Sequence, residues 1–223
     1  MPSGWEGFAQ EDAQRYIDPR LGPGASTDEF IEGGRAVVER ALEFAGELSG
    51  RQRALEIGCG VGRDTAHLAE HFAQVDGVDV SETMVRLASE RGLPANVRLH
   101  VLSGQDLNAF GDDSFDYVFS HLVFQHVADD AVVDAYLRET ARVLKPGAVA
   151  TLQFDTRPSS LVVRLVQWLP DPLLARERRR DIRRYRRPAA AIRASGAAAG
   201  LSLEGELDPE TAEHWFRWRA VAA

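Results

Sequence analysis

The strongest chemical pattern in the chain is a glycine loop that follows a short apolar segment. Residues 55–63 read Leu-Glu-Ile-Gly-Cys-Gly-Val-Gly-Arg, with glycines at Gly58, Gly60 and Gly62. Glycine adopts positive φ angles and, because it has no Cβ, lets a ligand approach the backbone closely. A loop of this kind between a strand and a helix is typical of nucleotide-binding sites, although several enzyme classes share it. We therefore expect Gly58, Cys59, Gly60 and Gly62 to contact a bound ligand.

Two details of this loop distinguish between ligands. The third glycine of the dinucleotide pattern G-x-G-x-x-G would fall on Arg63, so the spacing here is G-x-G-x-G instead. Glu56 directly precedes the loop and directs a negative charge toward the ligand. That carboxylate would repel a pyrophosphate and attract a ligand that carries ammonium and sulfonium groups. Both details disfavour a nicotinamide-dependent oxidoreductase.

Two more carboxylates follow the next predicted strands. Asp79 ends the second strand, where an acidic residue can accept hydrogen bonds from both ribose hydroxyls. Asp106 follows the third strand and could accept an adenine amino proton, while Met84 could pack on the adenine ring. Taken singly, these residues have plainer explanations as a helix cap, a turn residue and core filler. Together they predict an adenosine pocket, whose remaining predicted members are Val80, Gln105, Leu107 and Ser120.

The elements that must position these residues alternate between strands and helices. Predicted strands lie at 53–57, 75–80, 97–102, 115–120 and 148–154, the last after a turn at 145–147. Predicted helices lie at 30–48, 64–72, 82–91 and 129–144, and the tail adds a helix at 188–199 and strands at 201–207 and 213–221. Such alternation predicts an α/β fold with a mainly parallel sheet and helices on both faces. Ligands of these sheets bind at the carboxyl ends of the strands.

From about residue 52 to residue 154 the chain resembles the class I S-adenosylmethionine-dependent methyltransferases, especially the small-molecule enzymes of the UbiE-like, type 11 group. The resemblance rests on residues 55–62, 77–81, 104–107, 115–118 and 142–147. It implies a Rossmann-like, seven-stranded, mainly parallel sheet whose last strand is antiparallel. It also implies S-adenosylmethionine as cofactor and S-adenosylhomocysteine as product. In that family the glycine loop holds the methionine part, the Asp79-like residue binds ribose and the Asp106-like residue contacts adenine.

Two histidines follow the fourth predicted strand at the edge of the expected site. The resemblance places a histidine like His126 opposite the methyl acceptor in some family members, so His126 is the first candidate for a general base. His121 is the second candidate, with a role beside the cofactor as its alternative. Both histidines could also serve packing alone, because methyl transfer from a sulfonium works largely by alignment and exclusion of water.

The methyl acceptor is less defined by the sequence. The Pro-Pro signature of amino-directed nucleic-acid methyltransferases is absent after the fourth strand, which reads Phe119-Ser120-His121-Leu122. The paired acidic residues expected of metal-dependent catechol enzymes are not evident there either. We therefore expect a metal-independent enzyme for a small metabolite, in bacterial secondary metabolism, with an O, N, S or C acceptor left open. A macromolecule methyltransferase and an S-adenosylmethionine-binding relative with another reaction are the alternatives.

The chain ends and one insert differ most from that resemblance. We divide the single domain into an aromatic lid and first helix (1–50), a cofactor-binding core (51–155), an acceptor-cap insert (156–187) and a closing helix and strands (188–223). Residues 158–169 are predicted to form an amphipathic helix over the acceptor, with a dimer contact or core packing as alternatives. The tail aromatics at 215, 216 and 218 are expected to pack on one face of the last strand.

Eight arginines lie between Arg176 and Arg187. They could bind an anionic acceptor or RNA, but a solvated helix face paired with the surplus of acidic residues is favoured. The chain of 223 residues carries a net charge of −8, which argues against a general nucleic-acid binder. One cysteine, no signal-peptide pattern and no long apolar run predict a cytoplasmic protein. A homodimer stays open as an assembly.

Overall fold

The sheet of this protein has seven strands in the order β3-β2-β1-β4-β5-β7-β6. The computed structural model describes residue 6 and residues 27–158 and 183–221. Only β7 runs against its neighbours, pairing antiparallel with both β5 and β6, while the other described pairs are parallel. The strands are β1 (Arg53–Ile57), β2 (Gln74–Asp79), β3 (Val97–Val101), β4 (Phe115–Ser120), β5 (Leu144–Phe154), β6 (Leu201–Leu207) and β7 (His214–Ala220).

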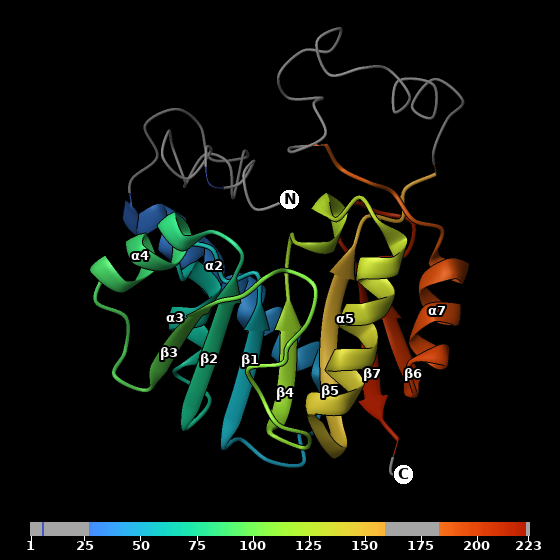
Figure 1. Cartoon of the computed structure of the whole chain (residues 1–223), viewed down its shortest axis with the longest axis horizontal. Coiled ribbons are helices and arrows are strands. Elements are labelled where there is room, and N and C mark those ends of the chain that lie inside the picture. Colours follow the sequence, from blue (N-terminus) through green and yellow to red (C-terminus); the bar gives the residue numbers. More distant parts are fainter. Residues whose placement is uncertain (1–5, 7–26, 159–182, 222–223) are drawn as a thin grey trace, which may run out of the picture.

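Helices cover both faces of this sheet, as Figure 1 shows, with α5 and α7 in front and α2 and α3 behind. The helical elements are α2 (Thr27–Ala45), α3 (Arg63–Leu68), α4 (Glu82–Glu90), the 3-10 helix η1 (Phe124–His126), α5 (Asp130–Val143) and α7 (Ala189–Ala198). One apolar core lies between the sheet and α5 and α7, and a second lies between the sheet and α2 and α3. The α/β fold with a seven-stranded sheet and an antiparallel last strand is therefore confirmed.

The central strands show why the sequence folds this way. In β1, Leu55 and Ile57 belong to the core under α5, while Ala54, directly before Leu55, belongs to the core under α2. Every residue of β4 is buried. Strands that are covered on both faces carry nearly continuous apolar runs, which is the pattern that predicted them.

The boundaries differ from the prediction where the chain is irregular. Residues 145–147, expected as a turn, lie inside β5, which begins at Leu144. The pairing register between β4 and β5 shifts between Phe115 and Tyr117, and Gly147 has a φ angle of 77°. A local bulge lets a strand continue through residues that would otherwise end it. Helix α3 ends at Leu68, four residues earlier than predicted, and η1 was not expected.

The tail aromatics do not share one face of β7, so that prediction was wrong. Trp215 lies in the core beside α2 and α3, while Phe216 and Trp218 lie in the core beside α5 and α7. Successive residues of a strand point to opposite faces, and the neighbours Trp215 and Phe216 therefore must separate. This places Trp215 next to the residues that follow β4.

Several predicted features lie outside the described residues. They are Trp5, Phe8 and Tyr16 of the aromatic lid, which was predicted from these residues and Phe30, most of the acceptor-cap insert, and the amphipathic helix predicted at 158–169. The division into four segments stays a prediction. Among the residues that the structure describes, no helix is long and apolar enough to cross a membrane.

Candidate active site

A cavity of about 230 Å³ lies at the carboxyl ends of β1, β2 and β4. The glycine loop, the start of α3, the loops after β2, β3 and β4, and one face of α5 line it. Parallel strands all place their carboxyl ends at one edge of a sheet, so this is where an α/β fold binds ligands. Ten of the fourteen predicted site residues line this cavity: Glu56, Gly58, Cys59, Gly60, Asp79, Val80, Met84, Gln105, His121 and His126.

The glycine loop is hydrogen-bonded to the end of β2. The backbone N–H groups of Gly58 and Cys59 both donate to the carbonyl of Val78, at 2.8 and 2.9 Å. Gly58 has a φ angle of 78°, and a Cβ on it would lie 2.1 Å from Cγ2 of Val123. No side chain fits at that position, so glycine brings the loop against the segment after β4 and leaves its backbone open to the cavity.

Four predicted residues do not line the cavity. Gly62 caps the start of α3 with a φ angle of 79°. The Ser120 hydroxyl donates to the carbonyl of Ile57 at 3.0 Å and so ties β4 to β1. Leu107 is fully buried in the core under α5. The carboxylate of Asp106 accepts a hydrogen bond from a backbone N–H within its own turn. The loop after β3 instead lines the cavity through residues 102–105.

Asp79 is fixed by backbone donors on both of its oxygens. One accepts from the N–H of Gly60 and the other from the N–H of Ser81, each at 2.9 Å. Burial raises the pKa of Asp79 despite these hydrogen bonds, and the nearby carboxylate of Glu6 raises it further. Each carboxylate oxygen accepts more than one hydrogen bond, so Asp79 retains capacity for hydroxyl donors of a ligand.

Glu6, far away in sequence, binds the start of α4. Its carboxylate accepts from the hydroxyl of Ser81 at 2.7 Å, from the N–H of Thr83 at 3.2 Å, and from the hydroxyl of Thr83. The Ser81 hydroxyl also caps α4 by accepting from the N–H of Met84 at 3.1 Å. Negative charge is favourable at a helix N-terminus, where backbone N–H groups lack partners. The contact brings residue 6 beside the loop that follows β2.

A buried cluster of charged side chains lies at the start of α3. Arg63 donates to Asp64 at 2.8 Å, and Nδ1 of His121 lies 3.0 Å from the same carboxylate. Burial alone would raise the pKa of Asp64, but Arg63 and the His121 hydrogen bond outweigh it, and the pKa lies at about 2. The His121 ring stacks on Trp215 with centroids 5.3 Å apart. Its Nε2 has no hydrogen-bond partner among the described residues.

Glu56 belongs to the same cluster, but its pKa is shifted in the opposite direction to that of Asp64. Its carboxylate accepts from the hydroxyl of Thr65 at 2.5 Å and is almost completely buried. Burial, followed by the charge of Asp64, raises the pKa of Glu56 well above its ordinary value. The cluster therefore holds a carboxylate that burial destabilises, and a cationic ligand group would relieve that cost.

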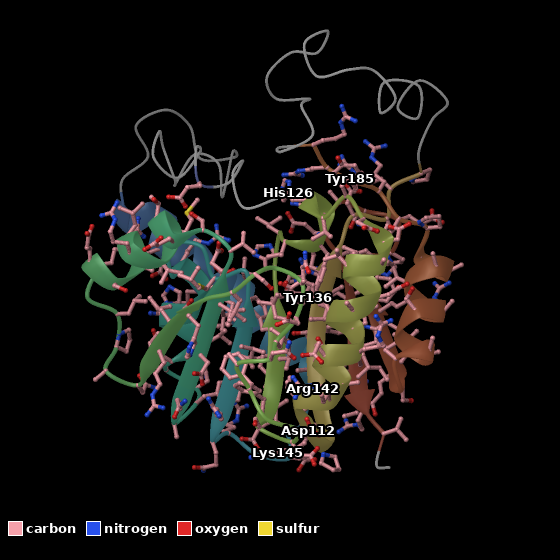
Figure 2. All side chains as sticks on the ribbon, viewed as in Figure 1. Asp112, His126, Tyr136, Arg142, Lys145 and Tyr185 are labelled. Carbon is pink, nitrogen blue, oxygen red and sulfur yellow. The ribbon has the colours of Figure 1, made fainter. Side chains whose placement is uncertain are left out.

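His126 lies on η1 and faces the cavity, near Tyr185 in Figure 2. The side-chain nitrogen of Gln125 lies 3.3 Å from Nε2 of His126. The position of η1 depends on the last residues of the insert. The N–H of Tyr185 donates to the carbonyl of Gln125 at 2.6 Å, and Arg187 donates to the carbonyls of Phe124 at 3.0 Å and Val127 at 2.6 Å.

These contacts change the interpretation of the arginine run where it is described. Residues 183–187 are not helical, and Arg183 and Arg187 are each only 7% exposed. Arg187 also donates to Asp130 at 2.7 Å, at the start of α5. The favoured prediction of a solvated helix face is therefore wrong for this end of the run. Arg187 is a structural clamp on the loop that carries His126.

The chain is similar in sequence to several known methyltransferases. Residues 55–152 match the family described as a methyltransferase domain. The chain is 34% identical over 128 residues to the methyltransferase GfsG of Streptomyces halstedii, covering 55% of this chain and 44% of that protein. It is 35% identical over 112 residues to a ubiquinone biosynthesis O-methyltransferase of Xanthomonas oryzae, covering 49% and 44%. The O-methyltransferase cnsE of Penicillium expansum is 30% identical over 186 residues, covering 73% and 65%.

Over residues 55–152 the chain is similar to the class I S-adenosylmethionine-dependent methyltransferases of the type 11 group. Solved methyltransferases share its fold: one from Mesorhizobium loti has a TM-score of 0.63 at 19% identity, covering 85% of this chain and 99% of that one. Another from Methanosarcina mazei also has a TM-score of 0.63, at 20% identity, covering 84% and 98%. Both solved structures are of S-adenosylmethionine-dependent methyltransferases. The chain spans less than half the length of GfsG and of the ubiquinone enzyme.

The residues around the cavity fit that cofactor. Asp79 offers a carboxylate for hydroxyls, and Glu56 offers a buried carboxylate for an ammonium group. Sequence reasoning missed the remaining titratable residues that line the cavity, namely Arg63, Asp64 and Tyr136. The first two directly follow the glycine loop, so their place in the sequence gave a signal. Tyr136 gave none, because an aromatic residue on an amphipathic helix is ordinarily core.

Proposed function

We propose that this methyltransferase transfers the methyl group of S-adenosylmethionine to a hydroxyl group of a small metabolite without a metal ion. The proposal rests on one cavity that is lined by two kinds of side chain, carboxylates and histidines. Carboxylates suited to the cofactor, Glu56 and Asp79, line it together with two histidines, His121 and His126, that follow β4.

The cofactor-binding roles follow from the chemistry of the lining. Asp79 accepts hydrogen bonds from the ribose hydroxyls, and the glycine loop and Glu56 hold the methionine part. Val80 and Met84 present apolar surface to adenine, and Gln105 adds a polar side chain. S-adenosylmethionine supplies an activated methyl group and a neutral leaving group. The residues of the chain therefore need only to align the acceptor and exclude water.

The histidines support an acceptor that must lose a proton. A hydroxyl is a weak nucleophile, and a positioned base contributes about 10²–10⁴-fold to such reactions. His126 lies on a loop that Arg187 holds, and it is the proposed base. His121 is fixed by Asp64 and stacked on Trp215, which suits a positioning role beside the cofactor. Two of the relatives reported above are named O-methyltransferases, which also favours an oxygen acceptor.

Calorimetric titration followed by an acceptor screen tests this proposal. The protein should bind S-adenosylmethionine and S-adenosylhomocysteine but not NADH. A panel of phenols, carboxylic acids and amines is then incubated with S-adenosylmethionine, with and without EDTA, and products are identified by mass spectrometry. A methyl ether formed equally in both conditions supports the proposal. Binding of NADH alone, transfer only to RNA, or turnover abolished by EDTA would each contradict it.

A further inference from the structure

One polar group of the cavity is not used by the proposed function. Tyr136 lies on α5 and lines the cavity together with Val132, one helical turn earlier. Residues four apart share one face of a helix, so this face of α5 forms a wall of the cavity. The Tyr136 side chain, labelled in Figure 2, is only 6% exposed. Its ring packs edge-on against Phe124, with centroids 5.9 Å apart and planes at 75°.

The hydroxyl of Tyr136 has no hydrogen-bond partner among the residues that the structure describes. The other tyrosine of the core differs, because the Tyr117 hydroxyl is bonded to Thr151. The Tyr136 hydroxyl is not fully enclosed by protein atoms but opens onto the cavity, so its hydrogen-bond partner comes from solvent or from a ligand there. Since the Tyr136 ring is held in place, a molecule in the cavity is the natural partner for its hydroxyl.

The surroundings of Tyr136 indicate which part of a bound ligand its hydroxyl would contact. Burial, followed by the charges of Asp79 and Asp106, raises the pKa of Tyr136 to about 12. The hydroxyl therefore stays protonated at neutral pH and acts as a donor. These two carboxylates follow β2 and β3, the strands whose loops supply Val80, Met84 and Gln105 to the cavity. Tyr136 lines the same cavity as these three residues, which the proposed function assigns to adenosine.

We propose that the Tyr136 hydroxyl donates a hydrogen bond to the adenosine half of the bound cofactor. The inference rests on the proposed location of S-adenosylmethionine in this cavity. Adenosine offers ring nitrogens and ribose oxygens as acceptors, whereas the other acceptor of the cofactor, the methionine carboxylate, is assigned to the glycine loop by the proposed function. Tyr136 is accordingly a cofactor-binding residue on α5, and it adds a donor to a set in which Asp79 is an acceptor.

Tyr136→Phe tests the proposal, because it removes one oxygen and keeps the ring against Phe124. Wild type and variant are titrated calorimetrically with S-adenosylhomocysteine and with 5′-methylthioadenosine, which keeps adenosine and lacks the amino-acid part. Loss of one neutral hydrogen bond should weaken both ligands by the same factor, about three- to tenfold. Tyr117→Phe is the matched control, since it removes a bonded hydroxyl away from the cavity and should leave both affinities unchanged.

The possible outcomes separate this inference from the proposed function. If wild type binds both ligands and Tyr136→Phe binds them equally well, Tyr136 does not contact adenosine and the inference is overturned alone. An unchanged affinity combined with a raised KM for the acceptor would move Tyr136 to the acceptor side. If the wild type binds neither ligand, the cofactor is not in this cavity and both proposals fall. Melting temperatures of both variants confirm that the folded protein is compared.

Discussion

Nδ1 of His121 lies 3.0 Å from a carboxylate oxygen of Asp64, and both side chains are almost entirely buried. The pKa of Asp64 lies at about 2, so the carboxylate is ionised and accepts the hydrogen bond. Nδ1 of His121 also lies 3.3 Å from a guanidinium nitrogen of Arg63, so the ring contacts both members of the Arg63–Asp64 pair. The Asp64–His121 pair joins the start of α3 to the segment after β4, which are the two parts of the chain that enclose the middle of the cavity.

Asp64→Asn should reveal this pair through the pH dependence of stability. The folded-state pKa of Asp64 is lowered from 3.8, so its contribution is fully present above that value and is lost as the pH falls toward about 2. The corresponding free energy of unfolding is about 2 kcal/mol. In urea titrations, the stability gap between wild type and Asp64→Asn should shrink by that amount between about pH 4 and pH 2. A stability gap that stays constant with pH would show that the pKa of Asp64 is not lowered in the folded protein.

Asp79→Asn should weaken cofactor binding. The amide keeps one acceptor oxygen, but its NH₂ group meets a backbone donor at 2.9 Å and cannot accept from a ribose hydroxyl. We expect a loss of about 1–3 kcal/mol in calorimetric titration with S-adenosylhomocysteine. Asp76→Asn is the matched control on the same strand. Asp76 pairs with Arg53 and His100, so that variant should lose stability without losing cofactor affinity. Equal affinities for wild type and Asp79→Asn would remove the ribose assignment.

The fold could be predicted because its signals are local. The run from Leu55 to Gly62 sets a strand, a tight loop and a helix start within a few residues, and such patterns depend little on distant contacts. Ser81 illustrates the same point, since a serine directly before a helical pattern is a local signal and its hydroxyl caps α4 by accepting from the N–H of Met84. Asp79 and Met84 line the cavity because strand ends fix where they point.

The rest of the site depends on contacts between distant segments, which a pattern in the sequence does not carry. Arg187 fixes the position of η1 although it lies 60 residues from Val127 in the sequence. Nothing in the neighbouring sequence distinguishes it from the other arginines. Ser120 and Leu107 follow strands, as site residues do, but their side chains point into the protein. Tyr136 has the spacing of a core residue and reaches the cavity only because of where α5 lies.

Glu56→Gln should stabilise the free protein and lower its affinity for the cofactor. Burial raises the pKa of Glu56, so the ionised form costs stability as the pH rises above the ordinary value of 4.5. The variant stays neutral, and its advantage in free energy of unfolding should grow from about pH 4 to neutral pH. Loss of a charged partner for the ammonium should weaken S-adenosylhomocysteine by about ten- to hundredfold. The affinity for 5′-methylthioadenosine, which has no ammonium, should not change. A variant less stable than wild type at neutral pH would contradict this account.

Arg187→Ala should destabilise the protein far more than loss of its ion-pair partner. The Arg187 side chain is 8% exposed, whereas that of Asp130 is 83% exposed, so the pair itself contributes little. The larger effect comes from the carbonyls of Phe124 and Val127, which would lose a charged donor. We expect about 2–4 kcal/mol for Arg187→Ala and under about 1 kcal/mol for Asp130→Asn, measured by urea unfolding. Equal losses would show that the ion pair, rather than the clamp, matters.

His126→Ala should lower turnover while cofactor binding is kept. The variant removes the proposed base from η1 but leaves the backbone contacts of Gln125 and Arg187 in place. With a hydroxyl acceptor, kcat should fall by about 10²–10⁴-fold, and the affinity for S-adenosylhomocysteine should stay within twofold of wild type. His71→Ala, which changes a histidine outside the cavity, is the control. The decisive measurement is the pH profile of kcat. A base of this kind makes wild-type activity fall as the pH drops through the histidine range, and the variant should lose that step. Unchanged turnover across the acceptor panel would leave His126 a structural residue and methyl transfer a matter of alignment alone.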